Sequence, residues 1–474
     1  MFEAVRVSTC FSEGITDPPK LPPAATDINL VSNQEIGSKP IFSRRTSGPV
    51  RILVEPGSYS CLNMGDVAML QVAVSRLTAL WPDARFGIVT QAAELLRSHC
   101  PAAIPVLEAG KRAWFQGRIF GRLQRQLPSP LSGMLEAAER GARRWMPSLV
   151  GSFLAFKMKL RHKEFGDMKA FLEAILGADL VIAAGTGMIT DHFHQRAIDL
   201  LDTLDMANRL GIPTAMFSQG LGPVTEPGLL AKMRIVLPAV QLIAVRENLV
   251  TPRLLESVGV SRHRILSPGD DAVELAFNHR AQNLGNAIGV NLRIAEYSQV
   301  DPAMVESVRA ALQNSATKYG SPFVAIPILC RDDADLKAIR RLLSGCDNYP
   351  DDRAQPDTPL KVIAQISRCR LVVTGSYHGA VLAVGQGIPA VALARSQYYL
   401  NKFFGLREQF GDGCEVIELE DDQFPEKLTA AIDRAWSRAE ELKPSLLTAA
   451  EKQILSGTNA YRRVADLVER NSRS

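Results

Sequence analysis

Short apolar runs bounded by Gly or Pro alternate with longer amphipathic stretches from Arg51 onward. The first run, 51–54, is typical of a buried strand, and apolar residues then recur at helical spacing from Val67 to Leu77. Asp66 stands directly before them as a favourable N-cap residue. Repetition of this strand-helix unit is typical of a parallel sheet covered by helices, so the alternation predicts an α/β fold.

The apolar runs fall into two series, and a chain of 474 residues is long enough for two domains. The first domain is expected over 49–277 and the second over 286–412, with a polar stretch between them near 278–285. Further strands are expected at 180–184, 214–218, 242–245, 287–291, 323–326, 371–374 and 390–393. Each run is followed by a helical segment, which favours two α/β domains.

The two ends of the chain lack this alternation. Residues 1–48 are rich in Pro, Ser, Thr and Asn and show no sustained apolar period, which predicts a flexible N-terminal tail. Residues 413–474 are expected to form C-terminal helices. From about 424, charged and apolar positions alternate without Gly or Pro pairs until Gly457, which predicts two closing helices.

Composition excludes several protein classes. A hydrophobic content of 46% with a net charge of +4 is unlike a disordered, fibrous or membrane-spanning chain. Residues 1–15 lack the apolar region of a secretory signal, and no apolar stretch reaches the roughly 18 residues of a spanning helix. The seven cysteines are widely spaced without a C-x-x-C pair, so neither a disulfide framework nor a zinc site is expected. We expect a cytoplasmic protein with reduced cysteines.

One stretch of the first domain, 111–163, has an unusual charge. It holds twelve Lys or Arg residues against two Glu, a net charge of +10, and six Trp or Phe residues are interleaved with them. This mixture fits a segment that lies on an anionic membrane surface, and it equally fits a solvated basic helical insertion. Because the charge is confined to this insertion and no recognised binding motif accompanies it, nucleic acid is not an expected partner.

Four loops that follow expected strands combine Gly with polar side chains, where open α/β sheets place their ligands. The first, 55–66, contains Asn63 and Asp66 but no dinucleotide-binding G-x-G-x-x-G pattern. The other loops are 185–191, 219–224 and 374–378. Each alone also fits an ordinary strand-to-helix turn.

Histidines mark two of these loops. His192 and His194 stand two residues apart and would point to different faces of a helix, so no metal site is expected there. His378 stands at the start of a short helix facing the interdomain cleft. A histidine in that place can donate a proton to a reacting group, although a lone histidine is more often structural.

Taken together and in this order, the loops resemble the polysaccharide pyruvyl transferase family over about 50–410. The matching segments are Asn63–Asp66, Ala178–Gly187, Gly220–Pro223, Val245–Glu247, Pro268–Ala272, Val372–Ala383, Gly387–Val391 and Lys402. The resemblance implies a GT-B-like architecture, in which two Rossmann-like domains face a cleft. It also implies transfer of the enolpyruvyl carbons of phosphoenolpyruvate to sugar hydroxyls, with a pyruvate ketal and phosphate as products and no cofactor.

This chemistry needs cations for the carboxylate and phosphate of the donor, and an acid for its methylene carbon. Arg246, Arg293 and Lys402 are the candidate cations, and His378 is the candidate acid. The remaining candidate substrate-binding residues lie in the matching loops; they are Asn63, Asp66, Gly185, Gly187, Gln219, Gly220 and Ser376. The implied acceptor is a saccharide, expected on a lipid-linked repeat unit of an exported polysaccharide at the inner membrane face.

The chain departs from the family pattern at Ser376. Many members have Arg two residues before the histidine, and Ser does not replace bidentate Arg recognition of an anion. Arg395, just after the strand at 390–393, is a candidate source of the missing guanidinium. Two other functions stay open: a GT-B-type glycosyltransferase that uses a nucleotide sugar, and a non-catalytic family member that binds a saccharide or a partner enzyme.

Overall fold

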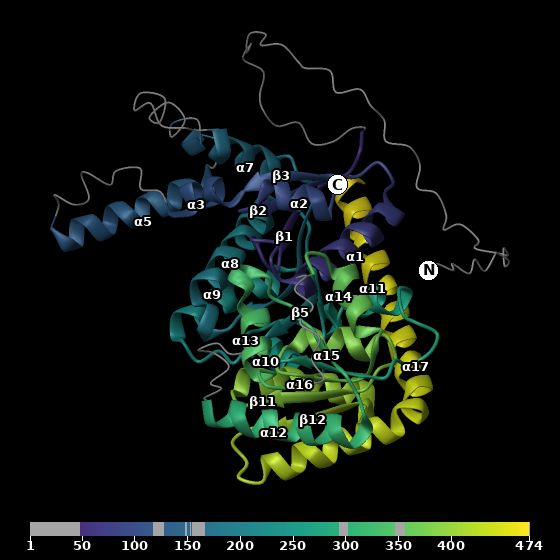
Figure 1. Ribbon diagram of the computed structural model, residues 1–474. Coiled ribbons are helices and arrows are strands. Elements are labelled where there is room, and N and C mark those ends of the chain that lie inside the picture. The colour runs from purple at the N-terminus through teal and green to yellow at the C-terminus, as the bar shows by residue number, and fades with distance from the viewer. Residues whose placement is uncertain are drawn as a thin grey trace, which may run out of the picture. The chain divides into compact units, whose positions relative to one another are not determined.

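The computed structural model describes residues 48–116, 128–146, 149–151, 153, 166–292, 302–346 and 356–473. Arg293 and nearly all of the expected tail at 1–48 lie outside the described residues, as does much of the insertion at 111–163. The described part is built on two parallel sheets with helices between consecutive strands (Figure 1). The α/β prediction is therefore confirmed.

The first sheet has seven strands in the order β3-β2-β1-β4-β5-β6-β7, and every pairing is parallel. The strands are β1 Arg51–Pro56, β2 Arg85–Thr90, β3 Ala103–Leu107, β4 Leu180–Ile189, β5 Thr214–Leu221, β6 Leu242–Val245 and β7 Ile265–Leu266. Its helices are α1 Met64–Leu80, α2 Ala93–His99, α3 Glu108–Gln116, α5 Ser129–Trp145, α7 Gly166–Leu176, α8 His194–Arg209, α9 Pro227–Val236, α10 Thr251–Ser257 and α11 Ala272–Asn278. Short 3-10 turns are η1 Asp191–Phe193, η2 Leu237–Ala239 and η3 Arg262–Arg264.

The second sheet has five parallel strands in the order β12-β11-β10-β8-β9. The strands are β8 Ala287–Asn291, β9 Phe323–Ala325, β10 Cys369–Thr374, β11 Ala390–Ala394 and β12 Cys414–Glu418. The helices are α12 Pro302–Tyr319, α13 Ala334–Leu342, α14 Pro359–Ile366, α15 Tyr377–Val384, α16 Gln397–Phe410 and α17 Phe424–Arg473, with η5 Arg331–Asp333 and η6 Gly411–Gly413 between them.

Two expectations about the C-terminal segment were wrong. Residues 413–474 are not all helical, because β12 adds the edge strand to the second sheet. The rest forms one helix, α17, which continues through Pro444 and Gly457 (Figure 1). Packing explains its continuity, since α17 contacts α1, α11 and β6 as well as α12 and β10 to β12. Tertiary contacts along its length outweigh the local preference for a break at Pro.

The N-cap of α1 was also predicted one turn too late. Asn63 is the capping residue, and its Oδ1 accepts the backbone N–H groups of Gly65 at 3.0 Å and Asp66 at 3.3 Å. Asp66 stands in the first helical turn instead, where a carboxylate is favoured by the helix dipole.

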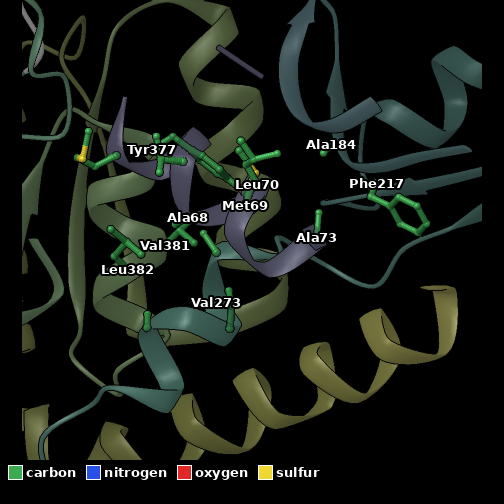
Figure 2. Close-up of a cluster of buried hydrophobic side chains, with 14 of the residues drawn as sticks. Ala68, Met69, Leu70, Ala73, Ala184, Phe217, Val273, Tyr377, Val381 and Leu382 are labelled. Carbon is green, nitrogen blue, oxygen red and sulfur yellow. The ribbon is translucent and has the colours of Figure 1, made fainter. Parts of the chain in front are cut away.

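Helix α1 packs at the centre of a hydrophobic core that includes side chains from both sheets. Figure 2 shows Met69 and Leu70 of α1 close to Tyr377 of α15, and Ala73 on the side of Phe217 of β5. Continuous apolar contact of this kind holds the loops at the strand ends in fixed positions.

The described part of the insertion differs from a freely solvated basic segment. Lys111 and Trp114 are buried, and Lys111 forms an ion pair of 2.6 Å with Glu55. Arg143 pairs with Glu139 at 2.8 Å. Exposed apolar side chains nevertheless gather on α5 and just after it; they are Leu131, Met134, Met146, Leu149 and Phe153. Lys111 and Arg143 are therefore structural cations, while part of the insertion presents apolar surface.

Candidate functional site

A cavity of about 480 Å³ lies where strand-end loops of both sheets meet. From the first sheet it is lined by residues after β1, β2 and β6, by the end of β4 and by the start of α8. From the second sheet it is lined by residues after β9, β10 and β11. Of the expected site residues, the structure brings Asn63, Asp66, Gly187, Arg246, Ser376, His378 and Lys402 to this cavity.

The loop after β9 is fastened directly to the start of α1. The backbone N–H of Met64 donates to the Ile328 carbonyl at 2.9 Å, and that of Cys330 donates to the Leu62 carbonyl at 2.8 Å. Asn63, which caps α1, forms a β-bridge with Leu329. Backbone contacts between the two sheets' loops thus form one wall of the cavity, and Asn63 has a structural task within that wall.

His378 lies in the first turn of α15, whose N-cap is Ser376. Its Nε2 is 3.9 Å from Oδ2 of Asp270, and the same oxygen is 3.6 Å from Nη1 of Arg246. Asp270 is 1% exposed at its side chain, and Arg246 is 2% exposed. The three side chains therefore form a buried group of two basic residues around one carboxylate.

Burial raises the pKa of Asp270 to about 6, against an ordinary value of 3.8. The positive charge of Arg246 and a hydrogen bond from the backbone N–H of Ala272 oppose this shift and limit it. A carboxyl group with this pKa changes charge near neutral pH. Asp270 can therefore change the net charge of the buried group that it forms with the cavity-lining residues Arg246 and His378.

Arg246 reaches the cavity across two glycines. Its guanidinium stacks on the Tyr377 ring, with Cζ 4.4 Å from the ring centroid. A Cβ at Gly187 would lie 2.6 Å from its Nη2, and a Cβ at Gly220 would lie 2.5 Å from its Nε. These glycines therefore leave the space that the guanidinium occupies. Nη2 of Arg246 is buried and has no hydrogen-bond partner among the described residues. Such a donor is expected where a ligand binds.

Gln219 and Gly185 support the site from behind. Gln219 is fully buried. Its backbone carbonyl accepts a hydrogen bond from the backbone N–H of Arg246 at 3.0 Å, and its side-chain Nε2 donates to the Phe217 carbonyl at 2.7 Å. Gly185 has φ +62, and a Cβ there would overlap Met69 of α1. Neither residue lines the cavity, so both hold the strand ends in position.

Lys402 enters the cavity from α16. Its Nζ lies 3.6 Å from the centroid of the Tyr398 ring, and the Tyr398 hydroxyl donates to the Gly187 carbonyl at 3.1 Å. A Cβ at Gly187 would lie 3.0 Å from the same Nζ. Gly187 therefore brings the cationic groups of Lys402 and Arg246 to one place next to α15.

Sequence reasoning missed two further cations of the cavity, Arg196 of α8 and Arg331 of η5. Arg196 stacks on Tyr59, with Cζ 3.0 Å from the ring centroid, and burial lowers its pKa to about 10. No glycine-rich motif surrounds either residue, so no local sequence pattern predicted that they line the cavity. Tyr59 follows β1 in the loop already singled out, and it was the available signal.

Arg395 does not line the cavity. Its Nε is 3.2 Å from the Glu420 carboxylate, on a partly exposed surface. The expectation that Arg395 supplies a guanidinium to the site therefore finds no support in its position. The pair forms because both residues lie beyond the ends of adjacent strands, β11 and β12.

The described residues hold no group of three or more His, Cys, Asp or Glu side chains arranged for a metal ion. His194 faces Glu226, with 3.4 Å between Nδ1 and the carboxylate. Asp191 accepts hydrogen bonds from the backbone and hydroxyl of Thr225.

Within the same described ranges, no helix is long and apolar enough to cross a membrane.

Comparison with known proteins bears on the family. The family model described as polysaccharide pyruvyl transferase matches residues 63–397. This range contains the cavity-lining residues of both sheets except Lys402, the two Tyr residues at its edge in α16, and the loop before Asn63. A comparison with curated proteins found no match.

Among solved structures, a protein described as a UDP-N-acetylglucosamine 2-epimerase from Listeria monocytogenes superposes with a TM-score of 0.51 at 11% identity, covering 88% of this chain and 95% of that one. The UDP-GlcNAc 2-epimerase of Neisseria meningitidis superposes with a TM-score of 0.48 at 14% identity, covering 89% of this chain and 100% of that one. At such identities the Listeria match shows the fold alone, and it confirms the GT-B-like arrangement of two Rossmann-like domains.

Proposed function

The chain belongs to the polysaccharide pyruvyl transferase family, and from that premise we propose that it transfers the enolpyruvyl group of phosphoenolpyruvate to a saccharide as a ketal. The observation that supports this proposal most is the meeting of Arg246, Lys402 and His378 in one cavity. Donor binding needs cations, ketal formation needs a proton donor, and the cavity holds both kinds of group in contact with the same space.

Arg246 and Lys402 are suited to the two anionic groups of the donor. Both cationic heads lie within about 3 Å of the point where a Cβ of Gly187 would stand, so they face one small volume. Arg246 is buried and still has a donor, Nη2, without a partner in the described structure. A carboxylate or phosphate satisfies such a group with a strong charge-assisted hydrogen bond.

His378 is the proposed acid. It protonates the methylene carbon of the donor, which leaves positive charge at C2, and a sugar hydroxyl then forms a bond to C2 and releases its proton. Departure of phosphate restores positive charge at C2, and a second hydroxyl forms the other ketal bond. One hydroxyl proton balances the new methyl group, and the other leaves with phosphate. The carboxylate of Asp270 lies 3.9 Å from Nε2 of His378, on the buried side of the imidazole.

Ser376 stands where many family members have Arg, and it also lines the cavity. It is the N-cap of α15, and its backbone N–H donates to Oγ1 of Thr374 at 2.9 Å. Under the proposed function, Arg246 and Lys402 bind the donor without a third cation at this position. Donor affinity then depends on these two residues more than on the α15 loop.

The acceptor is proposed to be a lipid-linked saccharide at the inner face of the membrane. Support comes from the exposed apolar side chains of Leu131, Met134 and Leu149, in a segment whose sequence is strongly basic. A basic segment with exposed apolar groups binds an anionic lipid surface by both charge and burial.

Product formation tests the proposed reaction. Purified protein is incubated with phosphoenolpyruvate and a panel of bacterial saccharides, and NMR follows the ketal methyl group while an enzymatic assay follows phosphate. The proposal expects both products together, their loss in His378→Ala, and normal rates in His263→Ala, a matched change at an exposed histidine. Consumption of a nucleotide sugar while phosphoenolpyruvate stays intact would instead identify a glycosyltransferase. Absence of either reaction across the panel would support a non-catalytic binding protein.

A further inference from the structure

We propose that the cavity contains a second cationic subsite, formed by Arg196 and Arg331, which binds an anionic group carried by the acceptor saccharide. The acceptor is then a sugar that bears a phosphate or a carboxylate close to the modified hydroxyls, rather than a neutral glycan. This inference rests on the function proposed above, because it assigns the donor to the other end of the cavity.

Arg196 is partly buried and forms no ion pair among the described residues, although the negative charges of Glu55 and Asp199 act on it from a greater distance. One end of its guanidinium donates from Nη2 to the Pro56 carbonyl at 2.9 Å, and its face covers the Tyr59 ring. Its Nη1 is buried and has no hydrogen-bond partner in the described structure. The neighbouring carboxylate of Glu55 already accepts hydrogen bonds from Lys111, Tyr59 and Thr203. A buried guanidinium nitrogen without a hydrogen-bond partner is costly, and an anionic ligand in the cavity would supply that partner.

Arg331 approaches the same cavity from the other sheet. It begins η5, directly after the loop that is fastened to the start of α1 by the Cys330 and Met64 hydrogen bonds. Arg331 is exposed and lines the cavity. The loop is thus fixed while the guanidinium is available to a ligand.

The donor does not need this second subsite. Its carboxylate and phosphate are matched by Arg246 and Lys402, which meet at Gly187 of β4 and lie near His378. Arg196, in contrast, is bonded at Pro56, where the neighbouring strand β1 ends. Two cationic groups over adjacent strands, which are about 4.8 Å apart, suit two different ligands that react with each other.

Neutral polar groups accompany the second subsite. Ser58 and Ser60 line the cavity in the loop that carries Tyr59, and their hydroxyl oxygens are 3.0 Å apart. Gln91, after β2, lines it as well. Hydroxyl and amide groups next to a guanidinium provide the mixture of donors and acceptors that a sugar ring with one charged substituent requires.

Calorimetric titration with glucose 1-phosphate, glucuronate and glucose tests the inference, with phosphoenolpyruvate titrated in parallel. At least one anionic sugar should bind more tightly than glucose. Arg196→Gln should weaken that binding by ~10-fold or more, as expected for loss of a charged hydrogen bond, while phosphoenolpyruvate affinity stays within about twofold. Arg196→Lys should retain part of the affinity. The phosphate and carboxylate probes show which anion the subsite prefers.

The matched control is Arg234→Gln, at an exposed position of α9 outside the cavity. Two results would overturn the inference: glucose binding as tightly as both anionic sugars, or Arg196→Gln weakening phosphoenolpyruvate as strongly as Arg246→Gln does. The proposed function has a separate failure, namely no binding of phosphoenolpyruvate to the unaltered protein. In that case an Arg196-dependent preference for anionic sugars would still stand.

Discussion

At the residue scale, the position of His378 depends on a glycine, because a side chain at that glycine would occupy the same space. A Cβ at Gly65, in the first turn of α1, would overlap the His378 imidazole. The glycine of the Asn63–Asp66 motif therefore provides room for the proposed acid. This explains in steric terms why that motif and the His378 loop occur in one sequence although they are far apart along the chain.

Gly65→Ala should displace His378 and lower the rate of ketal formation by ~100-fold or more, since small misplacements of reacting groups have effects of that size. The melting temperature should fall as well, because crowding at a buried position costs ~1–3 kcal/mol and outweighs the preference of a helix for Ala over Gly. Gly141→Ala, in α5, is the control, since a Cβ there meets no atom within 4 Å. Full activity in Gly65→Ala would show that His378 does not act from its present position.

The raised pKa of Asp270 makes the unfolding free energy of the protein depend on pH. A carboxyl group whose pKa is raised by folding stabilises the folded protein fully below its unfolded value of 3.8, and this contribution is lost as pH rises through about 6. Relative to Asp270→Asn, the protein should therefore lose ~2 kcal/mol of unfolding free energy between pH 4 and pH 7. Urea denaturation of both proteins at several pH values measures the difference. A difference that stays constant with pH would contradict the raised pKa.

At the scale of elements, helix α17 is joined to the site through a buried charged group. Arg76 of α1 pairs with Asp271 at 2.6 Å and with Glu274 of α11 at 2.5 Å. The Tyr461 hydroxyl of α17 donates to Asp271 at 2.8 Å. Since Asp271 is next to Asp270, the C-terminal helix supports the carboxylate that lies behind Arg246 and His378.

Tyr461→Phe should lower the unfolding free energy by ~1.5–3 kcal/mol, because a buried carboxylate loses one hydrogen-bond donor. Thermal and urea denaturation measure this loss, and phosphoenolpyruvate affinity should be unchanged. Tyr319→Phe, which removes a similar bond to the less buried Asp433, is the control and should cost less. If Tyr461→Phe weakened donor binding without loss of stability, α17 would have a direct role in the site.

Strong local patterns predicted most elements correctly. The expected strands at 242–245 and 287–291 match β6 and β8 at both ends, because continuous apolar runs with flanking Gly or Pro mark buried parallel strands. Strands β2, β3, β7 and β12 were missed. Gly87 and Pro105 interrupt the apolar runs of β2 and β3, β7 has only two residues, and β12 mixes apolar residues with Glu. Gly457 suggested a helix break, but a Cβ there would crowd the Arg76 guanidinium. That reason is tertiary, and no local pattern reveals it.

At the scale of the whole molecule, the order of loops along the chain predicted which of them meet. Asn63, Gly187, Arg246, His378 and Lys402 were expected together and do line one cavity. Arg196 and Arg331 were not expected, because each reaches the cavity through the packing of two sheets rather than through a motif. Family membership and a GT-B-like fold therefore follow from sequence order, while the charge of the cavity follows only from the folded chain.

The exposed apolar side chains of the insertion give a prediction at this scale. The protein should co-sediment with vesicles that contain phosphatidylglycerol and much less with neutral phosphatidylcholine vesicles. Changing Leu131 and Met134 together to Gln should weaken vesicle binding by ~10-fold or more, because apolar burial is lost. Leu455→Gln, at an equally exposed site of α17, is the control. Equal binding by all three proteins would contradict a membrane contact at α5.

Donor binding is the most direct test of the central claim, which is that Arg246 and Lys402 hold phosphoenolpyruvate next to His378. The measurement is the melting temperature of the purified protein against rising phosphoenolpyruvate, with UDP-sugars in parallel and Arg246→Ala as the variant. A ligand at about 100 times its dissociation constant stabilises the folded state by ~2.7 kcal/mol. We predict a shift with phosphoenolpyruvate that Arg246→Ala abolishes. A shift with UDP-sugars alone, or a phosphoenolpyruvate shift that Arg246→Ala leaves intact, would contradict the account.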